Sequence, residues 1–213
     1  MKALLYAAGA LVLILVLTVV FKPPPPFAAD YYNEDLDPAR APVQEETDEE
    51  AFPIRVSHGT MMLTPLASYD ITAVVLSKKR YYFGWSAEVA PYDFALGWKG
   101  MAKENTRKTV HIRQRSRWYY FQIKGESPYT PGYVSRNSAN THVIAATENL
   151  RQALRRVKKD DYIRLSGFLV KARGFIRGRE VFWNSSISRT DTGDGACEVL
   201  YAYRLYHEGK IYE

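Results

Sequence analysis

The sequence predicts a mainly β protein of the α+β class. We expect a small, coiled antiparallel sheet or a partly closed, OB-like barrel with one amphipathic helix, preceded by a single transmembrane helix. Aromatic residues make up 14% of the chain, including sixteen tyrosines, and such side chains suit the half-buried surface of a sheet. Several short runs also alternate apolar and polar residues with the period of a strand. The sequence divides into an anchor at 1–22, a linker at 23–52 and a basic β-rich domain at 53–213.

The anchor is predicted from an uncharged apolar run of eighteen residues, Leu4 to Phe21. As a helix this run is about 27 Å long, enough to cross the hydrocarbon core of a bilayer. A cleaved signal peptide is the alternative, but its apolar core is shorter and ends in a small-x-small site. Here Pro26 and Phe27 precede Ala28-Ala29. Lys2 and the terminal amine favour an N-terminus inside and a body outside the cytoplasm.

The linker differs in composition from both neighbours. It opens with four prolines, which favour a stiff, extended segment, and its remainder is predicted to be a disordered spacer. Residues 22–52 contain two basic and nine acidic residues, a net charge of −7, which leaves 26 basic and 14 acidic residues, a net charge of +12, in residues 53–213. The acidic tether could fold back on the basic body or simply keep the linker solvated.

The body begins with strand-like runs. Residues 71–76, apolar on both faces, predict a central strand. Residues 109–113 and 118–123 alternate and predict two adjacent strands. The segment 90–100 contains Pro91 and two glycines, and we interpret it as a packed loop held by Trp98.

One helix is predicted from Glu148 to Lys159, with Thr147 as its N-cap. Its apolar positions have helical spacing; they are Leu150, Ala153, Leu154 and Val157. After the helix, Gly167 suits a bulge or sharp coil, and residues 174–178 form the turn of a hairpin. A last strand is predicted to begin at Cys197.

Cations alternate with aromatic residues at 78–83, 107–120 and 173–183. This composition is typical of a groove that holds a polyanion and stacks rings on it. A solvated cationic surface whose aromatic side chains point into the core is the alternative. The expected binding residues lie in the second run and on the outer face of the helix; they are Arg107, Lys108, Arg113, Arg115, Arg117, Trp118, Arg151, Arg155 and Arg156.

Catalysis by Cys197 is the alternative hypothesis. A thiol nucleophile needs a nearby base and an orienting polar group. His142 is the candidate base, Asn140 or Asp191 the candidate orienter, and amides around Gly193 to Gly195 could face an oxyanion. A buried structural cysteine is the simpler interpretation, since residue 197 begins a predicted strand.

Other chemistries have weaker support. Asp191-Thr192-Gly193 matches the triplet of aspartic proteases, but its flanks differ and no second copy exists. The acids and histidines lack the spacing of a calcium or zinc site, so we expect no metal and no cofactor.

Three segments resemble a group of uncharacterised bacterial membrane-anchored proteins: SSISRTDTGDGACEVLYAY, SRNSANTHVIAAT and PYDFALGWKG. The resemblance implies a single-pass protein of the bacterial inner membrane and no particular activity.

The sequence therefore favours a tethered, non-catalytic binding or structural module of the bacterial envelope. Its expected partners are the bilayer, through residues 4–21, and an anionic lipid, an envelope polymer or an envelope protein. A thiol hydrolase and a nucleic-acid-binding or nuclease-like barrel are the alternatives, and an extracytoplasmic body makes nucleic acid a poor candidate.

Overall fold

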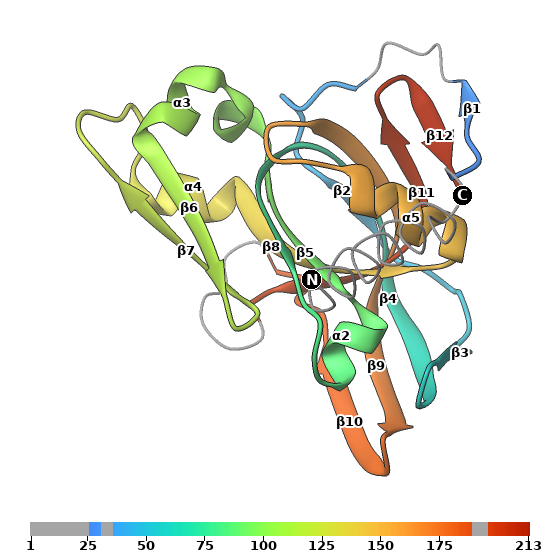
Figure 1. The fold of residues 1–213 in the computed structure, drawn as a ribbon. Helices are drawn as coiled ribbons and strands as arrows, with labels where there is room; N and C mark the ends of the chain where they lie inside the picture. The colour runs from blue at the N-terminus through green and yellow to red at the C-terminus, as the bar shows by residue number, and fades with distance from the viewer. Residues whose placement is uncertain (1–25, 31–35, 189–195) are drawn as a thin grey trace, which may run out of the picture.

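The structure is a computed structural model that describes residues 26–30, 36–188 and 196–213 (Figure 1). The apolar run 4–21, Asp191 and Gly193 to Gly195 lie outside these residues. In the part of the chain that is described, no helix combines the length and apolar character needed to cross a bilayer.

The protein is mainly β, as predicted, with a ten-stranded mixed sheet and a separate two-stranded sheet. The large sheet consists of β1 (Ala29–Asp30), β2 (Val43–Glu45), β3 (Phe52–Val56), β4 (Gly59–Arg80), β5 (Tyr92–Gly97), β8 (Ser138–Ala145), β9 (Tyr162–Ile176), β10 (Arg179–Asn184), β11 (Glu198–His207) and β12 (Lys210–Tyr212). The small sheet is β6 (Val110–Arg115) and β7 (Trp118–Ile123), so the predicted pair of adjacent strands is confirmed. The helices are α2 (Trp85–Val89), η1 (Lys99–Ala102), α3 (Glu104–Thr109), α4 (Pro131–Arg136) and α5 (Glu148–Arg156).

Five strands of the large sheet pair in a cycle. β4 pairs with β5, β5 with β8, β8 with β11, β11 with β9, and β9 with β4 again. Four of these pairings are antiparallel, but β8 and β11 are parallel, so the large sheet is mixed rather than antiparallel as predicted. A connection between parallel neighbours must cross over, and here it includes α5 and β9.

Gly167 lets two strands of this cycle approach closely. A Cβ atom at this position would lie 2.0 Å from the carbonyl oxygen of Tyr201. The register of β9 against β11 also shifts between Ala202 and Arg204. The predicted irregularity at Gly167 is therefore present, because a glycine is needed where two backbones meet.

The principal core lies between the cycle of strands and α5. On β5, Tyr92, Phe94 and Leu96 alternate into this core, where they meet Leu150 and Leu154 of α5. The Thr147 hydroxyl accepts from the Leu150 amide at 3.1 Å, which confirms the predicted N-cap. The helix ends at Arg156, earlier than predicted.

Lys78 binds the C-terminal end of this helix. Its ammonium donates to the carbonyl oxygens of Leu154, Arg155 and Val157 at 2.8, 2.9 and 2.7 Å. The last turn of a helix leaves carbonyl groups without intrahelical partners, and one cation satisfies three of them. Burial lowers the pKa of Lys78 to about 8, and the nearby charge of Arg80 adds to the effect.

Two segments differ from the interpretation of the sequence. Residues 92–97, read as a packed loop, form the buried strand β5, because Pro91 and Gly97 lie at its ends rather than interrupting it. Residues 29–30 and 43–45, within the predicted linker, pair with β12 and β4. These parts of the linker therefore run along the sheet.

Candidate functional site

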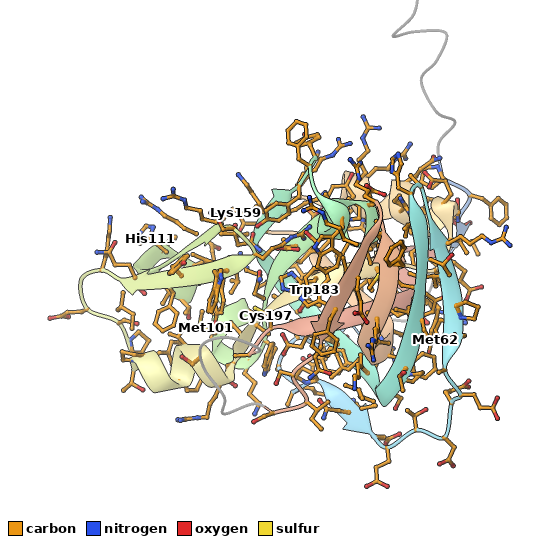
Figure 2. The ribbon with its side chains drawn as sticks, turned by 90° about the horizontal axis from the view of Figure 1, so that it is seen from below. Met62, Met101, His111, Lys159, Trp183 and Cys197 are labelled. Atoms are coloured by element: carbon orange, nitrogen blue, oxygen red, sulfur yellow. The ribbon has the colours of Figure 1, made fainter. Side chains whose placement is uncertain are left out.

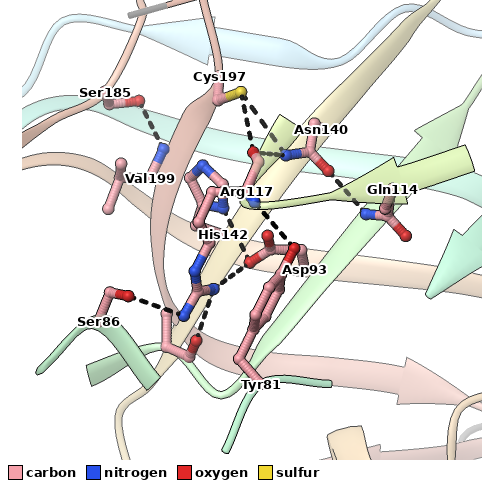
Figure 3. A network of polar contacts seen from close by, with 11 residues as sticks. Tyr81, Ser86, Asp93, Gln114, Arg117, Asn140, His142, Ser185, Cys197 and Val199 are labelled. Carbon is pink, nitrogen blue, oxygen red and sulfur yellow. Dashed lines mark hydrogen bonds and ion pairs between the residues drawn. The ribbon is translucent and has the colours of Figure 1, made fainter. Parts of the chain in front are cut away.

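A cluster of polar side chains lies on the face of β5, β8 and β11 that points away from α5. We define the polar cluster as Asp93, Arg117, Asn140, His142 and Cys197 (Figure 3). Strand register brings these residues together. His142 of β8 is paired with Asp93 of β5 on one side and with Val199 of β11, two residues after Cys197, on the other. The polar cluster lies beneath the turn of the β6–β7 hairpin and beside Trp183, whose ring centroid is 4.5 Å from that of His142.

Asp93 is fully buried at the centre of the polar cluster. Its Oδ1 accepts from Nη1 of Arg117 at 2.5 Å and lies 2.8 Å from Nδ1 of His142. Nδ1 of His142 makes no hydrogen bond despite this short distance. Since an isolated buried carboxylate is very unfavourable, Arg117 supplies the charge that Asp93 requires.

Arg117 reaches Asp93 from the two-residue turn between β6 and β7. Ser116 and Arg117 have φ values of 51° and 71°, the left-handed conformation that a tight hairpin of this type needs. The guanidinium also donates to Ala90 O at 2.9 Å and Ser86 Oγ at 3.2 Å, and lies 3.8 Å from the ring centroid of Tyr81. Arg117 thus attaches the hairpin to the large sheet.

Asn140 connects this turn to the cysteine. Its Nδ2 donates to Arg117 O at 2.8 Å and lies 3.6 Å from the half-buried sulfur of Cys197, while its Oδ1 accepts from Gln114 Nε2 at 2.7 Å. The thiol also lies 3.9 Å from the carbonyl oxygen of Arg117. In Figure 3 the sulfur is joined to Asn140 and Arg117, whereas His142 is joined to Asp93.

The surroundings of the polar cluster are also largely buried. Burial raises the pKa of Tyr119, whose hydroxyl lies 3.3 Å from Ser138 Oγ, with Glu198 and Cys197 nearby. Burial likewise raises the pKa of Tyr81, whose hydroxyl accepts from the Arg117 amide at 3.0 Å. The polar cluster therefore places the His142 imidazole beside the Asp93 carboxylate, and the Cys197 thiol joins the same network through Asn140.

Three segments singled out in the sequence contribute to the polar cluster. PYDFALGWKG supplies Asp93, SRNSANTHVIAAT supplies Asn140 and His142, and SSISRTDTGDGACEVLYAY supplies Cys197. Sequence reasoning selected His142 and Cys197 but missed Asp93. A single acidic residue within an otherwise apolar buried run was the available signal. Of the two predicted orienters, Asn140 contacts Arg117 and Cys197, and Asp191 lies outside the described residues.

The predicted binding residues of the second basic run occupy different environments. Arg113 and Arg115 are exposed on the outer face of β6, opposite Tyr120 and Trp118 of β7. Arg107 forms an ion pair with Asp160 at 3.1 Å, and Lys108 one with Glu104 at 3.1 Å. Arg117 points inward to Asp93.

The remaining predicted binding residues lie on α5. Arg155 and Arg156 are exposed, and Arg151 lies 3.3 Å from Glu148. Lys78 of β4 binds the C-terminal end of α5, and the guanidinium of Arg80, two residues further on, lies 5.8 Å from the ring centroid of Tyr92. Cations at the end of β4 therefore lie close to the end of α5 that carries Arg155 and Arg156. Figure 2 shows Lys159, just beyond α5, and His111 on the upper side of that view, with Cys197 below them.

No family model, no curated protein and no solved structure matches this chain. Among the described residues, no three or more His, Cys, Asp or Glu side chains are grouped closely enough to hold a metal ion.

Proposed function

We propose that this chain is a membrane-tethered, non-catalytic binding module of the bacterial envelope that contacts an anionic lipid or polymer through a basic and aromatic surface. The observation that carries the proposal is the outer face of the β6–β7 hairpin, where Arg113 is opposite Tyr120 and Arg115 is opposite Trp118. Cations and aromatic rings on one face of a strand pair suit a ligand that combines negative charge with flat or apolar groups.

The strand pairings support a more specific architecture. We infer that the cycle of β4, β5, β8, β9 and β11 is an OB-like barrel, with α5 preceding its fourth strand. By analogy with that fold, ligands bind on the second and third strands and the loops beside them. Here those strands are β5 and β8, and the β6–β7 hairpin connects them. The analogy therefore favours the side of the molecule on which the hairpin lies.

Location in the envelope rests on the sequence. The apolar run 4–21 would cross the inner membrane once, and the distribution of basic residues around it favours an extracytoplasmic body. In that compartment anionic lipids and polymers are more available to the basic surface than nucleic acid is.

Ion-exchange behaviour tests the proposal. The full chain in a mild non-ionic detergent is applied to an immobilised anionic polysaccharide, with heparin as the probe, and eluted with salt. We expect retention that weakens with salt, because binding releases counterions. Arg113→Glu with Arg115→Glu should elute at much lower salt than the wild type.

A matched control separates a specific surface from overall charge. Arg55→Glu with Arg179→Glu makes the same change in net charge at exposed positions on β3 and β10. Equal elution of the two double variants, or retention that salt does not weaken, would contradict the proposal. Tighter retention on single-stranded DNA than on heparin would favour a nucleic-acid-binding module instead.

A thiol hydrolase is the second candidate, because the polar cluster brings a thiol, a histidine and a carboxylate together, with His142 Nδ1 2.8 Å from Asp93 Oδ1. Cys197 shares this network through Asn140 rather than through a bond to His142. Hydrolysis of ester and thioester probes that disappears in Cys197→Ser and in His142→Gln would support this candidate. Activity that survives Cys197→Ser would exclude it.

A further inference from the structure

The start of the described chain is attached to the beginning of α5. The amide of Phe27 donates to Asn149 Oδ1 at 2.7 Å, and Asn149 Nδ2 donates back to Phe27 O at 3.0 Å. Nδ2 of Asn149 also donates to Glu213 O at 2.9 Å. After Phe27 the chain enters β1, which pairs with β12. The chain therefore leaves the body at a defined place, beside the N-terminus of α5.

The segment between this attachment and the apolar run is short. Prolines 23–26 follow Lys22, and four residues of polyproline span about 12 Å. A folded body of this size has a diameter of about 40 Å. If residues 4–21 cross the membrane, such a tether is too short for the body to turn its far side to the bilayer.

Beyond the C-terminal end of α5, where β4 ends, the surface combines cations with exposed aromatic residues. We define the α5 face as Arg80, Arg151, Arg155, Arg156 and the loop Tyr82–Phe83. Tyr82 and Phe83 are 67% and 92% exposed, and the guanidinium of Arg80 lies 4.6 Å from the ring centroid of Tyr82. Exposed aromatic rings beside cations suit the interface of an anionic bilayer, where rings enter the headgroup region and cations meet phosphates.

The acidic part of the chain lies elsewhere. Residues 46–51, the loop between β2 and β3, include four carboxylates. Figure 2 shows this acidic loop, in light blue, on the edge opposite Lys159, whereas Arg151 of the α5 face lines a pocket with Phe52, the residue that follows the loop.

We infer that the body lies against the surface of an anionic bilayer through the α5 face, with Phe83 in the headgroup region and the β2–β3 loop directed away. This inference rests on the proposed membrane tether. It leaves the outer face of the β6–β7 hairpin free for the envelope ligand.

Tryptophan quenching by brominated lipid tests this orientation. The full chain is reconstituted in nanodiscs of phosphatidylglycerol with phosphatidylcholine, and Phe83→Trp is compared with the wild type, whose four native tryptophans give the background. We expect brominated acyl chains to remove most of the emission that the new tryptophan adds. Phe175→Trp is the matched control, since Phe175 is 61% exposed on the β9–β10 hairpin, which projects away from α5 (Figure 1). Its added emission should persist.

Reversing the charge of two arginines on α5 tests whether the orientation depends on electrostatic attraction to the bilayer. Arg155→Glu with Arg156→Glu should abolish quenching at Phe83→Trp while the protein stays on the disc, and discs of phosphatidylcholine alone should give the same loss. Equal quenching at the two tryptophan positions, or none at Phe83→Trp on anionic discs, overturns the orientation. Failure of the full chain to remain on any disc overturns the tether itself, whereas retention on heparin tests the hairpin surface separately.

Discussion

Arg115 and Arg117 are two residues apart in one basic run, yet they have opposite environments. Arg115 is exposed on the outer face of the β6–β7 hairpin, whereas Arg117 points inward and pairs with the fully buried Asp93. The difference arises in the turn, where Ser116 and Arg117 adopt positive φ and direct the second arginine towards the large sheet. One residue type therefore stabilises the fold at one position and is available for a ligand at the other.

Removal of the buried Arg117 side chain should cause the largest loss of stability. Arg117→Met should lower the free energy of unfolding by about 3–5 kcal/mol, because it leaves the Asp93 carboxylate buried without its cation. Arg115→Met should change it by no more than about 0.5 kcal/mol, as is usual for an exposed residue. Urea unfolding of the two variants measures the difference, and similar losses would show that Asp93 does not depend on Arg117.

The loss of stability expected on removing Lys78 lies between those of the two arginines. Lys78→Met should destabilise the protein by about 1–3 kcal/mol, since the carbonyl oxygens of Leu154, Arg155 and Val157 lose a charged donor. The loss should concentrate in α5, so hydrogen exchange should accelerate there before it does in β4. Uniform acceleration across the sheet would contradict the role of Lys78 as the cap of the helix.

A smaller effect is expected from the pH dependence of stability. Burial lowers the pKa of Lys78 from 10.5 to about 8, so the unfolded chain binds more protons between these values and Lys78 makes stability rise with pH there. Tyr119 acts in the opposite direction above pH 10.0, because burial raises its pKa in the folded state. The rise should therefore appear between pH 8 and 10 and be absent in Lys78→Met. The same slope in both proteins would argue against this assignment.

Local pattern predicted much of the fold. The strands β6 and β7 were predicted because their residues alternate, and α5 because its apolar residues repeat with helical spacing above a threonine cap. β5 was missed, because a strand buried on both faces does not alternate and its proline and glycine resembled loop signals. The parallel pairing of β8 with β11 depends on segments far apart in the chain, which no local pattern specifies.

The candidate site was predicted less completely for the same reason. Asp93 meets Arg117 and His142 only after β5, β8 and the hairpin turn come together. Within the run from Arg113 to Arg117, composition alone does not distinguish the arginine that is buried. His142 and Cys197 were selected as a pair, but strand register directs the histidine to Asp93 and the cysteine to Asn140.

The salt concentration that elutes the folded protein from heparin tests whether the outer face of the β6–β7 hairpin binds the anionic ligand. Arg117→Met and Arg113→Met/Arg115→Met are compared at a temperature where both are folded. We predict that Arg117→Met elutes close to the wild type despite its lower stability, whereas Arg113→Met/Arg115→Met elutes at clearly lower salt with stability unchanged. Early elution of Arg117→Met with normal retention of Arg113→Met/Arg115→Met would contradict the claim that the outer face of the hairpin binds the anionic ligand.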